Sequence, residues 1–291
     1  MVKVRVPASS ANLGPGFDCF GIAWQCYNEM KFEKSDEVII TGCPEEYRNA
    51  DNMAYQAFMR TLKEAGKEAK GLEIHFGKTD IPVSRGLGSS AALISGAVMA
   101  ANALYDLGFS KERLFEIATD IEGHPDNVAP AMFGDFTVSA MSNGKPVTRH
   151  FPVNEKLTFC CMVPDFELRT SLARSVLPAT YEKPDALFNI SRSALLIRAI
   201  GDGDTELLKI AMEDRIHEPY RYRLIEGVDK AREMALSAGA AAMCISGAGS
   251  TLLAIGDNEA FYKTLSVEVP KVFPGWKVMK MILDRNGGQI V

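Results

Sequence analysis

Two glycines and two serines precede an uncharged, alanine-rich segment that ends at Tyr105. The stretch reads PVSRGLGSSAALISGAVMAANALY and carries no charge after Arg85. Glycines let a backbone approach an anion closely, and the N-terminus of a helix adds a partial positive charge, so phosphate is the natural ligand. Ser89 and Ser90 supply hydroxyl groups for a phosphate oxygen or for Mg²⁺. The alternative is that glycine and serine only cap a buried helix, and this pattern alone does not separate the two.

Three further segments combine glycine with polar residues. They are PASSANLGPGFD at 7–18, EGHPDNVAP at 122–130 and SGAGST at 246–251. Each alone is weak evidence, because Asn, Asp and Gly populate turns for backbone reasons. A fourth segment, GLEIHFGKT at 71–79, is close to a P-loop. We reject that match, since five residues separate its glycines where the motif needs four, and the segment has the pattern of a strand.

These motifs lie between segments that alternate between strand and helix patterns. Strands are predicted at 1–6, 23–33, 37–41, 71–82, 156–164, 240–245, 251–255 and 276–283. Helices are predicted at 52–65, behind the GLGSS turn, and at 110–122, 171–176, 185–200, 205–215, 224–237 and 259–267, with GHPDN as a turn. The order predicts an α+β fold with helices on one face of a mainly antiparallel sheet. We expect two domains, residues 1–155 and 156–291.

Composition narrows the classes of partner. The chain has 291 residues, a formal net charge of -5 and no block of Lys and Arg, which argues against nucleic acid or an anionic membrane. Two uncharged runs, 86–105 and 237–256, consist largely of Ala, Gly and Ser and are interpreted as buried elements, not membrane spans. The six cysteines form no C-x-x-C pair and no metal-ligand spacing with the four histidines. With no apolar signal segment near the start, we expect a cytoplasmic protein that binds a small molecule.

The four motifs resemble, in order and spacing, those of the GHMP kinases, and within that family the branch that phosphorylates homoserine. The resemblance covers essentially the whole chain. GLGSSAA is common to the family, whereas EGHPDNVAP and DRIHEPYR at 214–221 look specific to this branch. It implies an N-terminal ATP-binding α+β domain, a C-terminal ferredoxin-like α/β sandwich, ATP and Mg²⁺ as cofactors, and L-homoserine as the substrate. The resemblance does not decide whether the chain forms a homodimer.

The resemblance also implies a set of residues around the nucleotide. Ser90 would be one Mg²⁺ ligand, and Glu116 would be the other, because it lies eleven residues before Asn127, which is the interval in the family. The alternative for Glu116 is a solvated helix face, since Glu112, Glu116 and Asp120 form an acidic stripe. The residues implied around ATP are Asn52, Pro82, Val83, Ser84, Arg85, Gly86, Leu87, Gly88, Ser89, Ser90, Ala91 and Ala92.

A second implied set surrounds the amino acid. Its members are Asn12, Asp18, His124, Asn127, Arg174, Arg221 and Gly247. Two arginines can hold an α-carboxylate, and Asp18 suits an α-ammonium group. Outside the motif context, the two arginines would be interpreted as surface charge, His124 as a turn histidine, and DRIHEPYR as a helix end at Pro219.

Catalysis in this interpretation does not need a strong base. Many GHMP kinases carry an Asp where this chain has Asn127, and here the Asp is one place earlier, at Asp126. Phosphoryl transfer depends more on positioning and charge neutralisation than on proton removal. Thr170 is a further candidate for assisting catalysis. Two rival functions stay open: a GHMP kinase for another small alcohol, such as mevalonate or a sugar, and a binding protein on this fold that has lost catalysis.

Overall fold

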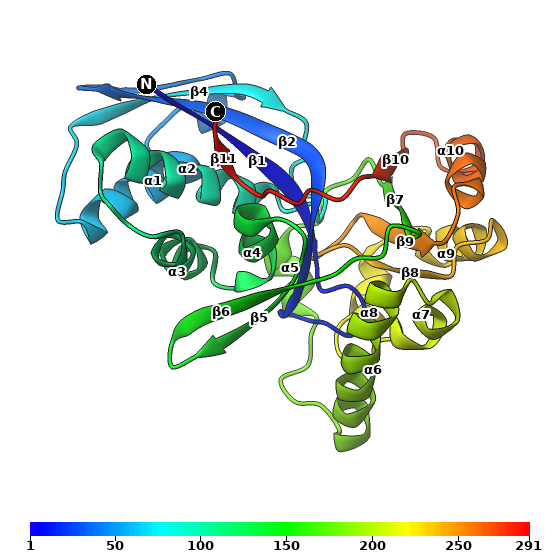
Figure 1. The fold of residues 1–291 in the computed structure, drawn as a ribbon. Helices are drawn as coiled ribbons and strands as arrows, with labels where there is room; N and C mark the ends of the chain where they lie inside the picture. Colours follow the sequence, from blue (N-terminus) through cyan, green and yellow to red (C-terminus); the bar gives the residue numbers. More distant parts are fainter.

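Two β-sheets form the framework of the protein in the computed structural model, which describes residues 1–291 (Figure 1). The first sheet has seven strands in the order β11-β1-β2-β4-β3, with β5 paired to β2 and β6 paired to β5. These strands are β1 (Val2–Ala11), β2 (Phe20–Ser35), β3 (Val38–Thr41), β4 (Gly71–Thr79), β5 (Phe136–Ser142), β6 (Lys145–Phe151) and β11 (Gln289–Ile290). All pairs are antiparallel except β3 with β4. The last strand therefore returns the C-terminus to the first strand of the chain.

The second sheet has four antiparallel strands in the order β10-β7-β9-β8. They are β7 (Thr158–Val163), β8 (Ala242–Ile245), β9 (Leu252–Gly256) and β10 (Lys277–Met281). With β7 as the first strand, the order 4-1-3-2 and the helical crossovers are those of a ferredoxin-like sandwich.

Helices cover both sheets. Those of the N-terminal half are α1 (Met53–Glu64), α2 (Ser89–Tyr105), α3 (Lys111–Glu122) and α4 (Pro125–Phe133), with a short 3₁₀ turn at Glu45–Tyr47. Those of the C-terminal half are α5 (Thr170–Ser175), α6 (Lys183–Asp202), α7 (Thr205–Ala211), α8 (Glu218–Arg221), α9 (Val228–Ser237) and α10 (Ala260–Val272), with a 3₁₀ turn at Tyr222–Leu224. None of these helices combines the length and apolarity needed to cross a membrane.

Helix α2 lies at the centre of the N-terminal half, which explains its lack of charge. It packs against α1, α3, α4 and the strands β1 and β2, so nine of its residues are buried. Gly96 lets the helix approach the sheet, because a Cβ at this position would lie 2.3 Å from the Met30 methyl group. The burial of α2 fixes the position of its N-terminus.

Strand β7 is buried on both faces and so accounts for the apolar run in the sequence. Cys160 and Met162 pack toward α9 and α10, while Phe159, Cys161 and Val163 pack toward α6, α7 and the first sheet. The expectation of helices on one face only is therefore wrong for this sheet. Helices α6 and α7 occupy the second face together with strands of the N-terminal half.

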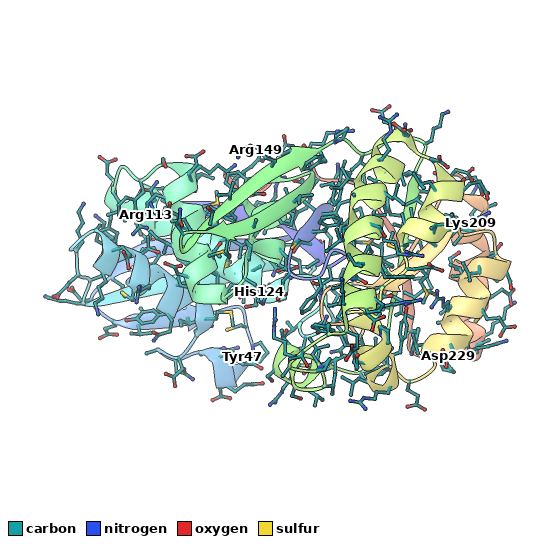
Figure 2. The ribbon with its side chains drawn as sticks, turned by 90° about the horizontal axis from the view of Figure 1, so that it is seen from below. Tyr47, Arg113, His124, Arg149, Lys209 and Asp229 are labelled. Carbon is teal, nitrogen blue, oxygen red and sulfur yellow. The ribbon has the colours of Figure 1, made fainter.

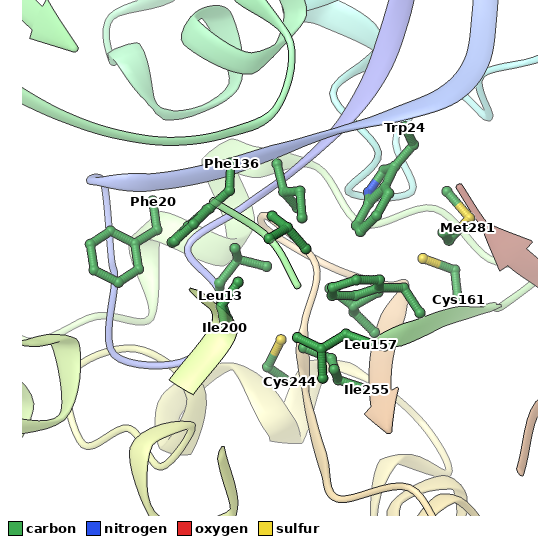
Figure 3. Close-up of a cluster of buried hydrophobic side chains, with 14 of the residues drawn as sticks. Leu13, Phe20, Trp24, Phe136, Leu157, Cys161, Ile200, Cys244, Ile255 and Met281 are labelled. Carbon is green, nitrogen blue, oxygen red and sulfur yellow. The ribbon is translucent and has the colours of Figure 1, made fainter. Parts of the chain in front are cut away.

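One hydrophobic cluster joins the two halves. Trp24 of β2 contacts Phe159 of β7, with ring centroids 5.1 Å apart. Figure 3 shows Leu13, Phe20 and Phe136 gathered with Ile200, Cys244 and Ile255. Because this core is shared, the loops of the two halves are held in fixed positions relative to one another where they meet.

Most predicted elements are present, and the departures have physical reasons. Helix α4 begins inside the segment predicted to be a turn, with Pro125 in its first turn, where no N–H is needed. Likewise Pro219 belongs to the start of α8, so DRIHEPYR is not a helix end. Strands β5, β6 and β11 were not expected, and α7 is shorter than the predicted helix. The domain boundary after residue 155 stays a prediction, because β11 pairs with β1.

Candidate active site

A cavity of about 680 Å³ opens where loops of the two halves meet. Its walls include most of the residues singled out in the sequence. From the N-terminal half these are Asn12, Asn52, Val83, Ser84, Arg85, Gly86, Gly88, Ser89, Ser90, His124 and Asn127, and from the C-terminal half Thr170, Arg174, Arg221 and Gly247. Glu122 and Asp126 also line it, whereas Glu116 does not.

The loop before α2 directs its carbonyl groups into the protein. Five consecutive carbonyl oxygens, from Ser84 to Gly88, accept hydrogen bonds from Leu168 N, Thr251 N, Ser246 Oγ, Ser9 N and Ala92 N, at 2.6 to 3.2 Å. The N–H groups from Gly86 to Ser90 donate to no other group of the protein. These donors converge with the positive end of the α2 dipole, so this loop suits a phosphate group.

Two glycines of this loop cannot be replaced without movement. Gly86 and Gly88 have φ of +76° and +69°. A Cβ at Gly86 would lie 2.2 Å from the Ser246 carbonyl oxygen, and one at Gly88 would lie 2.0 Å from Ser9 Oγ. The loop is thus fitted between the first strand and the SGAGST segment.

The carboxylate that reaches Ser90 is Glu122, the last residue of α3. Its Oε2 accepts a hydrogen bond of 2.6 Å from Ser90 Oγ. Burial raises the pKa of the Glu122 carboxyl, and this outweighs the lowering by the Ser90 hydroxyl and His124. A hydroxyl and a carboxylate in contact are hard oxygen donors of the kind Mg²⁺ prefers.

The expected pairing of Ser90 with Glu116 is wrong. Glu116 accepts from Arg113 Nη1 at 2.7 Å and pairs with Lys145 at 3.4 Å, outside the cavity. Figure 2 shows Arg113 at the outer side of the N-terminal half, well separated from His124. Glu116 and Glu122 are six residues apart, so they project from the helix in directions about 120° apart. The acidic stripe is therefore a solvated face, the alternative considered from the sequence.

The loop after β1 provides polar groups at the other end of the cavity. Asn12 has φ of +72° and donates through Nδ2 to the Gly247 carbonyl at 2.7 Å, while its Oδ1 accepts from Asp18 N at 3.0 Å. Asp18 accepts two hydrogen bonds from Arg174, at 2.7 and 3.1 Å. This pair raises the pKa of the Arg174 guanidinium. The two predicted residues are thus brought together, and they bind each other.

Arg221 is buried without a carboxylate partner. Its side chain is among the largest fully buried ones, with 1% of the residue exposed. Nε donates to the Ala173 carbonyl at 3.1 Å, and Nη1 donates to His217 Nδ1 at 3.2 Å and to the Gly247 carbonyl at 3.3 Å. Nη2 donates to no protein group. Because Arg221 lines the cavity, this nitrogen is free to bind a ligand there. A buried cation with neutral acceptors only is a strong site for an anionic ligand group.

His124 and Asn127 are held by Asp126, which is 2% exposed. Asp126 Oδ1 accepts from His124 Nδ1 at 2.7 Å and from Asn127 N at 2.8 Å. Burial lowers the pKa of His124, but the hydrogen bond and charge of Asp126 outweigh it, so the pKa lies above its ordinary value. The Asn127 side chain accepts from Ser9 Oγ at 2.9 Å, which leaves its Nδ2 toward the cavity. Asp126 therefore acts through its neighbours.

Some predicted residues are not part of the cavity wall. These are Pro82, Leu87, Ala91, Ala92 and Asp18. Leu87 and Ala92 are buried in the hydrophobic cluster that joins the two halves, and Ala91 in the cluster of the N-terminal half, so they support the loop from behind. Asn52 lines the cavity, but its amide caps α1 and binds the Tyr47 carbonyl. The exposed Thr170 opens α5, one turn before Arg174.

Sequence reasoning missed Glu122 and His217. A signal for Glu122 was available, because a carboxylate in the last turn of a helix opposes the helix dipole and needs another reason to be there. His217 stands inside DRIHEPYR, but no pattern indicates which side chain of that segment contacts Arg221. Only the fold brings it beside Arg221 and the loop after β1.

Comparisons with known proteins agree with this architecture. The GHMP kinases N terminal domain matches residues 52–135 and the GHMP kinases C terminal domain matches residues 196–266. A homoserine kinase of Clostridium acetobutylicum is 39% identical over 296 residues, with all of both chains covered. A homoserine kinase of Clostridium botulinum is 41% identical, with 100% and 99% of the two chains covered. The crystal structure of a homoserine kinase from Cytophaga hutchinsonii has a TM-score of 0.88 at 30% identity and covers 100% and 97%.

The two sheets and the phosphate-type loop define a GHMP kinase, so the predicted fold class is confirmed. Full-length relatives at this level of identity place the chain in one family of that class, and it belongs to the homoserine kinases. The Leishmania major mevalonate kinase has a TM-score of 0.71 at 15% identity, a likeness of fold alone.

Proposed function

We propose that the chain transfers the γ-phosphoryl group of ATP to the side-chain hydroxyl of L-homoserine. The products are O-phospho-L-homoserine and ADP, a step of threonine biosynthesis. The homoserine kinases among its full-length relatives support this proposal. The cavity supports it independently, because one end offers donors for phosphate and the other offers charges for an amino acid.

The triphosphate would bind at the loop that opens α2. The free N–H groups of Gly86 to Ser90 would donate to phosphoryl oxygens, and the helix dipole would stabilise their charge. Val83, Ser84, Arg85 and Ser89 would line the same end of the site. Asn52 would contact the nucleotide mainly through its surface, since its amide is occupied by helix capping.

Ser90 and Glu122 would hold Mg²⁺. Their contact at 2.6 Å provides a hydroxyl and a carboxylate, and no cationic side chain pairs with Glu122 to compete for it. When bound, Mg²⁺ would neutralise charge on the β- and γ-phosphoryl oxygens. Glu116 would not bind the metal, because it pairs with Arg113 and Lys145 outside the cavity.

L-Homoserine would place its charged groups beside Arg221 and Asp18. The two N–H groups on Nη2 of Arg221 suit an α-carboxylate. Asp18, with Asn12 and the Gly247 carbonyl nearby, suits the α-ammonium group. Arg174 would add charge on the carboxylate side while keeping its pair with Asp18.

Transfer would then depend on positioning. The homoserine hydroxyl oxygen bonds to the γ-phosphorus as the bond to the β-γ bridging oxygen breaks, and its proton can pass to a γ-phosphoryl oxygen. Asn127 Nδ2 would orient the hydroxyl or the transferring group, and His124 would lie beside it, held by Asp126. A loose transition state needs positioning and charge neutralisation more than a base. Thr170 stays a hypothesis as a helper.

Arg221 is the observation that carries the choice of substrate. A kinase for an uncharged sugar has no use for a buried cation that lacks a carboxylate partner. Mevalonate also carries a carboxylate, but it has no ammonium group to bind Asp18. Arg221 and Asp18, and not the phosphate loop, therefore distinguish L-homoserine from the rival substrates.

The test is a Mg²⁺-dependent ADP-release assay with purified protein and ATP. The substrates are L-homoserine, mevalonate, galactose and shikimate, with homoserinol as the matched analogue without a carboxylate. We expect turnover with L-homoserine, a product of the mass of phosphohomoserine, and at least a hundredfold lower kcat/KM for homoserinol. Preference for another alcohol would overturn the substrate proposal, and no turnover with nucleotide still bound would favour a binding protein.

Two further proposals concern the setting of the enzyme. We place it in the cytoplasm, where ATP is available and thiols stay reduced, and all six of its cysteines are free thiols. A homodimer stays a hypothesis that light scattering would test.

A further inference from the structure

His217 lies beneath Arg221, on the side away from the cavity. It precedes α8, is completely buried, and does not line the cavity. Its Nε2 lies 2.8 Å from the Gly14 carbonyl oxygen, and its Nδ1 lies 3.2 Å from Arg221 Nη1. The ring therefore connects the loop after β1 with the arginine of α8.

The two partners determine the form of the imidazole. A carbonyl oxygen only accepts a hydrogen bond, so Nε2 must carry the proton. A guanidinium only donates, so Nδ1 must present its lone pair. Burial and Arg221 both lower the pKa of His217, while Asp214, whose Oδ2 is 3.9 Å from Nε2, and Asp18 act in the opposite direction. The ring is thus neutral in this arrangement.

The ring of Phe17 extends the contact to both arginines. Phe17 stacks on His217 with ring centroids 5.2 Å apart and an interplanar angle of 24°. The guanidinium carbons of Arg221 and Arg174 lie 5.0 and 5.6 Å from the centre of the same ring. Gly14, which His217 binds, belongs to the same loop, and a Cβ there would lie 2.4 Å from the Met212 carbonyl oxygen. The loop and α8 therefore have little freedom to separate.

We propose that His217 is a positioning residue that holds Arg221 for the substrate carboxylate without neutralising it. All three acceptors of Arg221 are uncharged, namely His217 Nδ1 and the carbonyls of Ala173 and Gly247. They fix Nε and Nη1 and leave Nη2 for the ligand. A carboxylate at position 217 would fix the arginine equally well but would compete with the substrate for its charge. This inference rests on the proposed function, since it specifies how that site selects a carboxylate.

The experiment compares three substitutions that separate the two hydrogen bonds. His217→Asn keeps an acceptor near the position of Nδ1, so Arg221 retains its partner. His217→Gln keeps a donor near the position of Nε2 for Gly14 but removes the acceptor for Arg221. His217→Phe keeps the stacking on Phe17 and removes both hydrogen bonds. We expect KM for L-homoserine to rise at least about tenfold in the Gln and Phe variants and less than about threefold in the Asn variant, with KM for ATP unchanged.

Kinetic constants and one spectroscopic signature decide the outcome. Equal KM for L-homoserine in the Gln variant and the wild type would overturn the proposal, and so would equal changes in KM for ATP and for L-homoserine. If the variants do not fold, the wild-type enzyme labelled with ¹⁵N-histidine still tests it. Its four histidines should include one neutral ring protonated at Nε2, whose Nδ1 signal shifts on addition of L-homoserine. Protonation of the His217 ring itself at Nδ1 would contradict the proposal, whereas His124, whose Nδ1 donates to Asp126, is expected to carry that proton. Lack of wild-type activity on L-homoserine would instead contradict the proposed function.

Discussion

The two ends of the cavity present different chemical groups to a ligand. At the phosphate end, defined by residues 84–92, the groups that face the ligand are backbone N–H groups and the Ser90 hydroxyl. At the amino-acid end, defined by Asn12, Asp18, Arg174 and Arg221, they are the side chains of Asn12, Arg174 and Arg221, with Asp18 bound to Arg174 behind the cavity wall. The first end comes from one continuous segment. The second is assembled from three segments that are far apart in the sequence.

This difference determines which substitutions impair ligand binding at each end. A backbone site is held by the packing of its loop, so it is sensitive to added volume and little affected by changes in neighbouring side chains. A side-chain site depends on a few charges, so a single truncation removes its function and leaves the fold intact.

We expect the largest effect at the carboxylate beside Ser90, which forms the side-chain pair of the phosphate end. Glu122→Gln should reduce kcat by roughly a thousandfold, about 4 kcal/mol of transition-state stabilisation, because the neutral amide is a poor Mg²⁺ ligand. Glu116→Gln is the matched control on the same helix and should stay within about twofold, since it weakens only pairs with Arg113 and Lys145 that lie outside the cavity. Steady-state kinetics at several Mg²⁺ concentrations measure both. Equal losses would contradict our assignment of Glu122.

At the amino-acid end, removing one charge should abolish substrate selection. Arg221→Ala should reduce kcat/KM for L-homoserine by roughly a hundredfold or more, because charge-assisted hydrogen bonds contribute about 1.5 to 3 kcal/mol each. Arg221→Lys should recover only part of this, since an ammonium group cannot reproduce the guanidinium fork. Arg169→Ala, an exposed arginine before α5, is the control. A titration with ATP should give the same Kd for all three variants and the wild type.

Asn127 and Asp126 should differ although they are adjacent. Asn127→Ala should reduce kcat by about a hundredfold, because it removes a group that orients the reacting oxygens. Asp126→Asn should cost about tenfold or less, since Asp126 only holds His124 and the Asn127 N–H. Both are measured as kcat at saturating substrates. The reverse ranking would mean that Asp126 is a general base.

At the phosphate end, added side-chain volume should reduce both stability and ATP binding. Gly88→Ala places a Cβ 2.0 Å from Ser9 Oγ, whereas Gly66→Ala, with a similar φ of +65°, meets nothing within 4 Å. Each change costs about 1 kcal/mol of conformational free energy, and we expect Gly88→Ala to add about 1 to 3 kcal/mol for the steric conflict. Chemical denaturation gives the stability, and calorimetric titration should give weaker ATP binding for Gly88→Ala alone. If the two variants matched in both measurements, the fit of the loop would not matter.

The same contrast explains what could be predicted from the sequence. The phosphate loop was predictable because glycine, serine and an apolar helix follow one another within a single segment. Ferredoxin-like order in the C-terminal half followed only from the family resemblance, since strand patterns do not specify neighbours. The pairing of Ser90 with Glu122 was missed because an interval in sequence does not say which face of α3 a carboxylate occupies. The bond between Arg174 and Asp18 joins residues 156 positions apart, which no local pattern encodes.

A carboxyl group beneath the amino-acid end should make the stability of the protein depend on pH. Glu218 is 3% exposed and accepts hydrogen bonds from Ile245 N and the Tyr222 hydroxyl, at 2.6 and 2.7 Å. Burial, followed by the charge of Asp214, raises the pKa of Glu218 to about 7. In the unfolded chain this carboxyl titrates near its ordinary value, so between these two values only the folded state keeps the proton. Stability from this group should therefore decrease as the pH rises toward 7 and level off above it.

Glu218→Gln should remove that dependence, because the amide stays neutral at every pH. Between about pH 5 and pH 8 we expect the wild type to lose up to about 3 kcal/mol more stability than the variant, an upper bound set by the size of the shift. Urea denaturation at both pH values measures it, and Glu233→Gln, an exposed substitution on α9, serves as the control. Parallel curves for the wild type and Glu218→Gln would mean that Glu218 is ionised in the folded protein. Glu218 would then be a second buried negative charge beside Asp214, whose side chain is also fully buried.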